Sequence, residues 1–289
     1  ALEGAPRDMG YVRLLYGPRG PRSGHEDLVL RSNDVSALNV AWQFFCNGVQ
    51  YPFLRHKLHP FFGVYFTPTP VEHFGLLTEW LETHQDAFRE PGARVLDLGT
   101  GCGVVSFLLR ELRPDLRIVA SDMCPNAVFS VKSEVARWGA SGIEVVESDL
   151  FDSLGELGPF DAVVFNPPWI PRPAHMAGRD LRGAGDVCGG NDYPPDLFRR
   201  LFEEAPRFLK PGGRLLVLFS NYAECRGLVA ASPLAPFAEA GAPLALREVT
   251  RRAVKPAARS QHRMTRRDKA WALGREHQVE LWQFVKEPA

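Results

Sequence analysis

The sequence has no long apolar run and no excess of charge of either sign. No window approaches the roughly 18 consecutive apolar residues that span a membrane. Lys plus Arg and Asp plus Glu number 34 each, so the formal net charge is zero. Such a protein has no overall field that attracts nucleic acid or a membrane, and any attraction must come from a local patch. The first residues also lack the pattern of a signal peptide, so we expect a cytoplasmic location.

Cysteine is scarce, and metal-ligand spacing is absent from the sequence. The five cysteines lie at positions 46, 102, 124, 188 and 225, and no two have CxxC spacing. We therefore expect neither a disulfide nor a zinc site, but free thiols in a reducing compartment. The histidines show no HExxH or other paired spacing, so we expect no metal. With 45% apolar and 24% charged residues, the composition is that of an ordinary globular protein.

Apolar segments of strand and helix type alternate from residue 93 onward. The first five predicted strands are apolar runs, as expected when both faces of a sheet are covered. This alternation predicts an α/β protein with a doubly wound, seven-stranded Rossmann-like sheet, in which the last two strands form an antiparallel edge hairpin. The predicted strands are 94–98, 117–121, 143–147, 161–165, 213–219, 244–253 and 277–285, and the predicted helices here are 103–113, 125–138, 194–209 and 223–231.

The N-terminal part lacks this alternation of strands and helices. Residues 1–90 are predicted to form an N-terminal arm and cap, separate from a catalytic domain at 91–289. Its first 27 residues resemble a loose arm, and helical spacing follows at 34–46 and 70–84. Between these helices, residues 49–68 hold six aromatic residues, too many for a solvated linker. We predict that this segment covers the C-terminal edge of the sheet and forms a wall of the binding pocket.

A glycine turn follows the first predicted strand, in VLDLGTGCGVVS at 95–106. Gly99, Gly101 and Gly103 allow the backbone to turn tightly and to approach a ligand closely. The GxGxxG pattern of dinucleotide-binding proteins fails here, because position 104 is valine. Asp122 ends the second strand, where an acid of a doubly wound fold accepts hydrogen bonds from ribose hydroxyls.

A second turn, Asn166-Pro167-Pro168-Trp169, follows the fourth strand. Consecutive prolines cannot continue a β-ladder, so they predict a rigid turn at the edge where ligands bind. The carbonyls of Asn166 and Pro167 can accept the two N–H bonds of a planar nitrogen group, and the indole can stack on its plane. Such acceptors orient the nitrogen lone pair for in-line attack, which is catalysis by proximity and orientation.

Both turns resemble motifs of class I S-adenosylmethionine (SAM) methyltransferases. The D-x-G-x-G-x-G form resembles their motif I, and NPPW resembles the signature of enzymes that methylate planar nitrogens. Together with TPTPVEH (67–73), Gly189-Gly190 and LKPGGRLLVLFS (209–220), they most resemble release-factor glutamine N5-methyltransferases, over about 63–220. The resemblance implies SAM as cofactor, catalytic roles for Asn166, Pro167 and Trp169, and cofactor contacts from Asp97, Gly99, Thr100, Gly101, Gly103, Asp122, Met123, Asp149, Leu150 and Asn166.

The sequence also departs from that family. Trp169 stands where the family has tyrosine, YFTPTP (65–70) stands where it has a motif resembling IPRP, and residues 245–289 have no counterpart. Three acceptors therefore remain open: a protein glutamine, a nucleobase amine in RNA or DNA, and a small metabolite. A SAM-binding scaffold subunit is the non-enzymatic alternative, although the intact NPPW turn argues against it. The broken GxGxxG pattern argues against an NAD-dependent dehydrogenase.

One local patch of charge is present near the C-terminus. Residues 247–275 contain ten Arg or Lys against two acidic residues. The segment is predicted either to bind an anionic partner such as RNA or to form a solvated hairpin loop. No membrane partner is expected.

Overall fold

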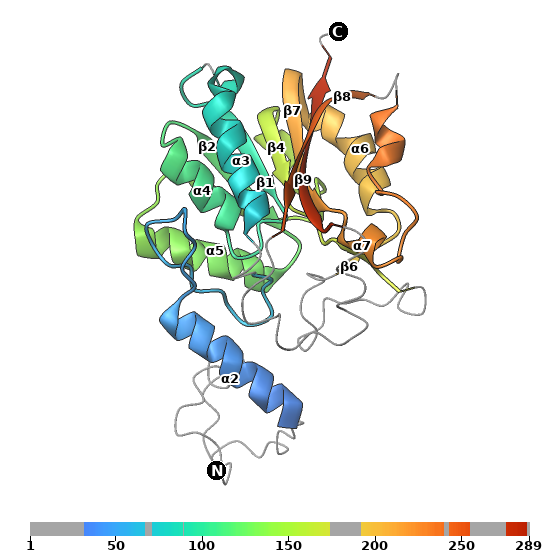
Figure 1. The fold of residues 1–289 in the computed structure, drawn as a ribbon. Coiled ribbons are helices and arrows are strands. Elements are labelled where there is room, and N and C mark those ends of the chain that lie inside the picture. Colours follow the sequence, from blue (N-terminus) through green and yellow to red (C-terminus); the bar gives the residue numbers. More distant parts are fainter. Residues whose placement is uncertain are drawn as a thin grey trace.

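The computed structural model describes residues 32–66, 71–88, 90–173, 192–239, 243–254 and 276–287. They form a seven-stranded sheet in the order β3-β2-β1-β4-β7-β9-β8, in which β1 to β4 and β7 are parallel (Figure 1). The predicted doubly wound α/β fold is confirmed. The strands are β1 (Arg94–Leu98), β2 (Arg117–Asp122), β3 (Ile143–Glu147), β4 (Phe160–Phe165), β7 (Leu209–Ser220), β8 (Leu244–Ala253) and β9 (Gln278–Lys286), and a separate pair comprises β5 (Ile170–Pro171) and β6 (Asp192–Tyr193).

Helices cover both faces of the sheet. Helices α3, α4 and α5 lie on one face and α6 on the other (Figure 1). The helices are α2 (Ser32–Asn47), α3 (Glu72–Thr83), α4 (Val104–Leu112), α5 (Pro125–Trp138), α6 (Leu197–Phe208) and α7 (Tyr222–Cys225), with short 3₁₀ turns at Gln85–Phe88, Gly155–Leu157 and Ala235–Ala238. The helix predicted over 223–231 is wrong in length, because α7 ends at Cys225 and Gly227 follows with a positive φ of 66°.

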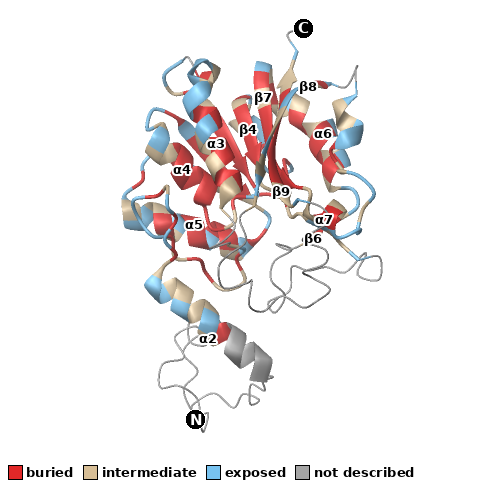
Figure 2. Cartoon of the chain, in the orientation of Figure 1, coloured by how far each residue is buried: buried red, intermediate tan, exposed pale blue. Residues whose placement is uncertain are grey.

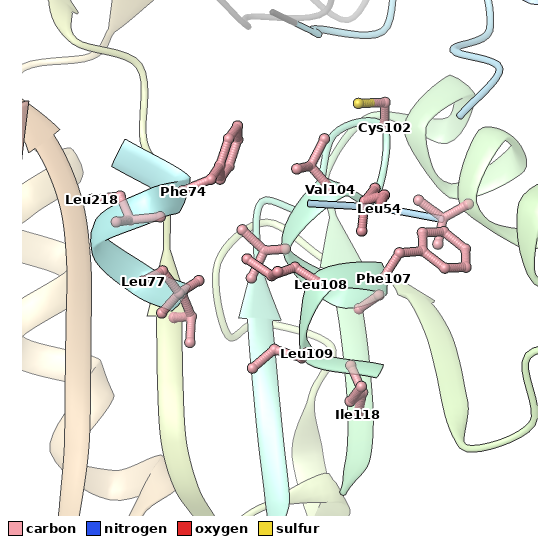
Figure 3. Close-up of a cluster of buried hydrophobic side chains, with 14 of the residues drawn as sticks. Leu54, Phe74, Leu77, Cys102, Val104, Phe107, Leu108, Leu109, Ile118 and Leu218 are labelled. Carbon is pink, nitrogen blue, oxygen red and sulfur yellow. The ribbon is translucent and has the colours of Figure 1, made fainter. Parts of the chain in front are cut away.

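The hydrophobic core consists of two layers separated by the sheet. Along β7, Leu216 and Leu218 pack with α3, α4 and α5, whereas Leu215 and Val217 pack with α6. This alternation follows from the period of two in a strand, and it explains why the strand is apolar at successive positions. Burial runs through the central strands and the inner helix faces (Figure 2). In the first layer, side chains of α3 lie opposite those of α4 (Figure 3).

The last two strands form the antiparallel edge that the sequence predicts, but with β9 inside it. Strand β9 pairs with both β7 and β8, so β8 is the edge strand although it comes earlier in the chain. Helix α3 packs on this hairpin, and Trp80 Nε1 donates a hydrogen bond to Gln283 Oε1 at 2.5 Å. Strand β9 is thereby held by strand pairs along both edges and by α3 on one face.

The aromatic segment before α3 is anchored on α5. Asn126 Nδ2 donates to the carbonyl of Phe62 at 3.0 Å, and the Phe61 N–H donates to Ser130 Oγ at 3.2 Å. His59 contacts the buried carboxylate of Glu134 at 3.2 Å. Helix α2 projects away from the sheet at the end of this segment (Figure 1). The segment therefore lies against the helix that follows β2.

The expectation of free thiols is wrong for one cysteine. Cys46, Cys102 and Cys225 form no disulfide, whereas Cys124 is disulfide-bonded. Spacing along the chain did not reveal this bond, because pairing depends on the distance in space between two Cβ atoms. No helix among the described residues has the length and apolar character needed to span a membrane. The 1–27 arm, Gly189, Gly190 and most of 247–275 lie outside the described residues.

Candidate functional site

The register of the sheet places the glycine turn and the NPPW turn side by side. In the parallel pair β1–β4, Leu98 is the partner of Phe165, so Gly99 and Asn166 are the next residues of neighbouring strands. A Cβ added to Gly99 would lie 3.0 Å from the Phe165 ring. Both turns therefore lie at the C-terminal edge of the sheet, where ligands bind in this class of fold.

The backbone of the glycine turn can be approached closely by other groups, because its glycines have no side chains. Gly101 has a φ of 54° and Gly103 a φ of 89°, both in the left-handed region that favours glycine. A Cβ at Gly101 would lie 3.2 Å from the carbonyl oxygen of Tyr65, and one at Gly103 would lie 2.9 Å from the Phe107 ring. The aromatic segment thus reaches the glycine turn, and the space beside Gly101 stays open only without a side chain.

Asp97 fixes the turn from beneath rather than facing open solvent. Its Oδ2 accepts hydrogen bonds from Thr100 Oγ1 at 2.6 Å, Ser106 Oγ at 2.6 Å and the Ser106 N–H at 3.0 Å. Burial raises the pKa of this carboxyl to about 6, while the hydrogen bonds from Ser106 and Thr100 oppose the shift. The predicted contact of Asp97 with the cofactor stays a prediction, and this geometry adds a structural role.

Asp122 connects the end of β2 to the same turn. Its Oδ2 accepts the Gly101 N–H at 2.9 Å, and its Oδ1 accepts the Cys124 N–H at 2.9 Å. Burial raises its pKa, and these backbone hydrogen bonds lower it. Each carboxylate oxygen has a second lone pair, so this side chain can still accept bonds from a ribose.

Three of the predicted cofactor contacts, Met123, Asp149 and Leu150, are near the ends of β2 and β3. Met123 is 43% exposed, and Leu150 is buried with a φ of 47°. Asp149 is not a free acceptor, because Arg200 NH1 lies 3.2 Å from its Oδ1. Arg200 lies on α6. The sequence analysis did not predict its pairing with Asp149, because the two residues are far apart in the chain. One Asp149 oxygen remains to accept from a ligand.

The NPPW turn presents a buried acceptor without a partner. Asn166 Oδ1 is inaccessible to solvent and has no hydrogen-bond partner among the residues that the structure describes. Trp169 is half-buried, and its Nε1 donates a long hydrogen bond of 3.4 Å to the carbonyl of Leu218. An unsatisfied buried carbonyl is unusual in a folded protein and indicates a ligand-binding role.

His73, which sequence reasoning did not single out, also belongs to this region. Its ring lies 4.9 Å from the Trp169 ring at an interplanar angle of 81°. The side chain is buried, and neither ring nitrogen has a hydrogen-bond partner. The available signals were its place at the end of the TPTPVEH stretch and its position in an otherwise apolar helical stripe.

The aromatic segment lies beside the glycine turn at this edge. Tyr51 Oη lies 3.9 Å from Cys102 Sγ in the glycine turn, and the Tyr51 ring contacts Phe74 edge to face. These contacts place the segment over the turn that follows β1. The prediction that it also forms a wall of the acceptor pocket stays a prediction.

Residues 75–177 match the family model of the methyltransferase small domain. These residues are therefore similar to a methyltransferase small domain. The resemblance to class I methyltransferases is confirmed, and the site described above lies within or beside the matched range.

Curated relatives refine the likeness. A release factor glutamine methyltransferase of Geobacter sulfurreducens is 33% identical over 129 residues, which are 43% of this chain and 44% of the relative. The enzyme of the same name from Deinococcus radiodurans is 35% identical over 146 residues, which are 48% and 51%. The chain therefore spans about half the length of the curated relatives it matches.

A solved structure supports the fold alone. A Galdieria sulphuraria protein assigned as a sarcosine dimethylglycine methyltransferase aligns with a TM-score of 0.52 at 15% identity. The alignment covers 85% of this chain and 97% of that protein. At this identity the likeness says nothing about the substrate.

In the part of the basic segment that the structure describes, residues 247–254, three arginines form salt bridges with glutamates. Arg251 Nε lies 2.8 Å from Glu280 Oε1, Arg252 NH2 lies 2.5 Å from Glu79 Oε1, and Arg247 pairs with Glu287. These arginines have acidic partners within the fold and are poor candidates for binding phosphate. An anionic partner for the remainder, 255–275, stays a prediction.

Proposed function

We propose that the protein is a SAM-dependent N-methyltransferase whose acceptor is a planar nitrogen, and that this nitrogen is the side-chain amide of a protein glutamine. The observation that carries the proposal is the unpartnered Asn166 Oδ1 beside the glycine turn. The names of the curated relatives support glutamine in a release factor as the acceptor. Translation factors act in the cytoplasm, which is the location we propose.

The residues of the glycine turn fit a bound SAM. Gly101 leaves a space that a Cβ would narrow, and Asp122 keeps lone pairs for hydroxyl donors. The carboxylate of Asp97 lies beneath the same turn and favours a cationic ligand above it. When bound, SAM would supply a methyl group activated by its sulfonium charge.

The protein's contribution is to position the acceptor. Asn166 Oδ1 and the carbonyl of Pro167 accept the two N–H bonds of the amide, so the nitrogen lone pair turns out of conjugation. Trp169 lies three residues beyond Asn166 and flanks the pocket with its indole. No strong base is needed, because positive charge that develops on the N–H groups is shared by these carbonyls. The rate enhancement thus comes from orientation and fixed dipoles.

The test is methyl transfer from tritiated SAM to a purified bacterial release factor by the wild type and Asn166→Ala. We expect kcat to fall by about 10²- to 10³-fold while SAM affinity stays nearly unchanged, by analogy with the loss of one preorganised dipole. Asn47→Ala, at the exposed end of α2, is the matched control and should keep full activity. A parallel loss of turnover, SAM affinity and melting temperature would assign Asn166 a structural role instead.

The same assay separates the other acceptors. An oligonucleotide tests the nucleobase amine, and free carboxamides test the small metabolite. SAM binding in calorimetry without transfer to any of them would favour the scaffold subunit. Incorporation of tritium into the release factor, and into neither of the other acceptors, supports the proposal.

A further inference from the structure

His73 is a buried histidine that the fold does not satisfy. Its relative exposure is 1%, and both Nδ1 and Nε2 lack a hydrogen-bond partner. Its neighbours are the rings of Phe74, at a centroid distance of 3.9 Å, and Trp169, at 4.9 Å. A buried N–H without a partner costs free energy that a phenylalanine or leucine at the same place would avoid. Packing alone therefore does not explain a histidine here.

The position of His73 connects it to the proposed acceptor site. It is the second residue of α3, and its ring contacts the indole of the NPPW turn. Asn166, three residues before that indole, presents the other unpartnered atom of the turn, Oδ1. One end of a planar ligand can thus meet an acceptor from the turn after β4 and the other a donor from α3. A small polar ligand would complete these two unsatisfied polar groups, one in the turn and one on the helix that contacts its indole.

The protonation state of His73 suits this place. Burial lowers the pKa of its imidazole to about 3, so the ring is neutral at physiological pH. A neutral imidazole carries one N–H donor and one lone-pair acceptor. It can therefore donate a hydrogen bond without placing a second positive charge beside a sulfonium, which would oppose binding of the cofactor.

A primary carboxamide has a third polar group that the NPPW turn does not use. Its two N–H bonds are directed to Asn166 Oδ1 and the Pro167 carbonyl, which leaves its own carbonyl oxygen without a donor. We propose that the imidazole N–H of His73 donates to this carbonyl oxygen and so selects a carboxamide as the methyl acceptor. The proposal rests on the proposed function. A glutamine in a protein and a free carboxamide share this chemistry.

The experiment compares His73→Phe, which keeps the ring but removes the N–H, with His73→Gln, whose amide can still donate. His84→Phe is the matched control, because His84 ends the same helix and stacks on Trp80 away from Trp169. Each variant is assayed with tritiated SAM on three acceptors: a bacterial release factor, N-acetylglutaminamide, and a deoxyadenosine oligonucleotide. SAM affinity and melting temperature are measured on the same samples.

We expect His73→Phe to lower kcat/KM for the carboxamide acceptors by about 10- to 100-fold, as one lost hydrogen bond would. Its SAM affinity should be unchanged and its melting temperature equal or higher, because no internal hydrogen bond is lost. His73→Gln should recover most of the activity, and His84→Phe should match the wild type. Activity on the release factor but not on N-acetylglutaminamide would identify a protein glutamine as the source of the carboxamide, and the reverse would identify a free carboxamide.

A direct readout separates this inference from the proposed function. The ¹⁵N NMR signals of the His73 imidazole should shift when N-acetylglutaminamide or the release factor is added. Methylation of a carboxamide with no such shift, or with full activity in His73→Phe, overturns the inference and leaves the proposed function standing. Transfer only to the oligonucleotide overturns the carboxamide assignment, and with it both proposals.

Discussion

At the scale of single residues, Asp97 carries a charge that the fold disfavours. Burial raises its pKa from 3.8 to about 6, against the hydrogen bonds from Ser106 and Thr100. Between these two pH values the native state holds a proton that the unfolded chain has released. The contribution of Asp97 to stability is therefore fully present below pH 4 and is lost as the pH rises through 6.

The variant Asp97→Asn tests this sign, since an amide oxygen still accepts from Ser106 and Thr100. We expect the free energy of unfolding of the wild type, relative to the variant, to fall by about 1.4 kcal/mol per pH unit between pH 4 and 6. Urea denaturation at four pH values measures it. The control is Asp115→Asn, because its hydrogen bond from Arg113 lowers the Asp115 pKa and its effect must have the opposite sign. Parallel curves for wild type and Asp97→Asn would contradict the assignment.

What the sequence could predict at this scale depended on contacts between neighbours in the chain. Asn166 and Gly101 stand in local motifs, so their place at the sheet edge was predictable. Arg200 and His73 meet their partners across the fold, on elements far apart in sequence. Nothing local distinguishes such residues from a solvated arginine or a core histidine.

At the scale of elements, the aromatic segment 49–66 is held by α5 and in turn reaches the glycine turn. Phe61 is 7% exposed and lies between the rings of Phe45, at 5.7 Å, and Phe129, at 4.8 Å. The carbonyl of Tyr65 approaches Gly101 at the far end of the segment. The glycine turn is therefore contacted by a segment outside the sheet.

We expect Phe61→Ala to loosen this segment and weaken SAM binding, because removing a buried ring typically costs about 3–5 kcal/mol. Hydrogen exchange should rise in residues 49–66 before the sheet exchanges, and calorimetry should show lower SAM affinity. Phe237→Ala, which removes a ring stacked on Phe202 over the opposite face, is the control. It should destabilise the protein without increasing exchange in 49–66. Unchanged SAM affinity in Phe61→Ala would separate the segment from the cofactor.

The elements themselves were predictable where burial dominates. Strand β1 is covered on both faces, so its apolar run indicated it with the bounds that the structure has, and the predicted bounds of the edge strand β3 agree as well. The segment after β7 was not predictable in the same way. Its apolar residues suggested a helix over 223–231, but Gly227 in a left-handed conformation interrupts the chain there. The left-handed backbone of Gly227 therefore ended the helix that the spacing of the apolar residues had indicated.

At the scale of the whole molecule, β9 joins the edge strand β8 to the rest of the sheet. This strand supplies partners to β7 and β8, and its Gln283 receives the hydrogen bond of Trp80 from α3. Without it, both neighbouring strands would present unpaired N–H and C=O groups and exposed apolar side chains.

A chain that ends at residue 275 should therefore fail to fold. We expect low solubility, dye binding by exposed apolar surface and no cooperative thermal transition. Adding a synthetic peptide of residues 276–289 should restore part of the native signal, because β9 forms main-chain hydrogen bonds along its length. A soluble truncated chain with a sharp transition would show that β9 is an accessory strand.

The strand order also has a consequence for protein synthesis. Strand β7 leaves the ribosome well before β9, yet one of its edges has no partner until β9 has emerged. At about 5–20 residues per second, the interval between the two strands lasts several seconds, which is long compared with encounters between nascent chains. The nascent protein is thus expected to depend on chaperones during this interval. Any stalled translation product that lacks the last strand is expected to be recognised as misfolded.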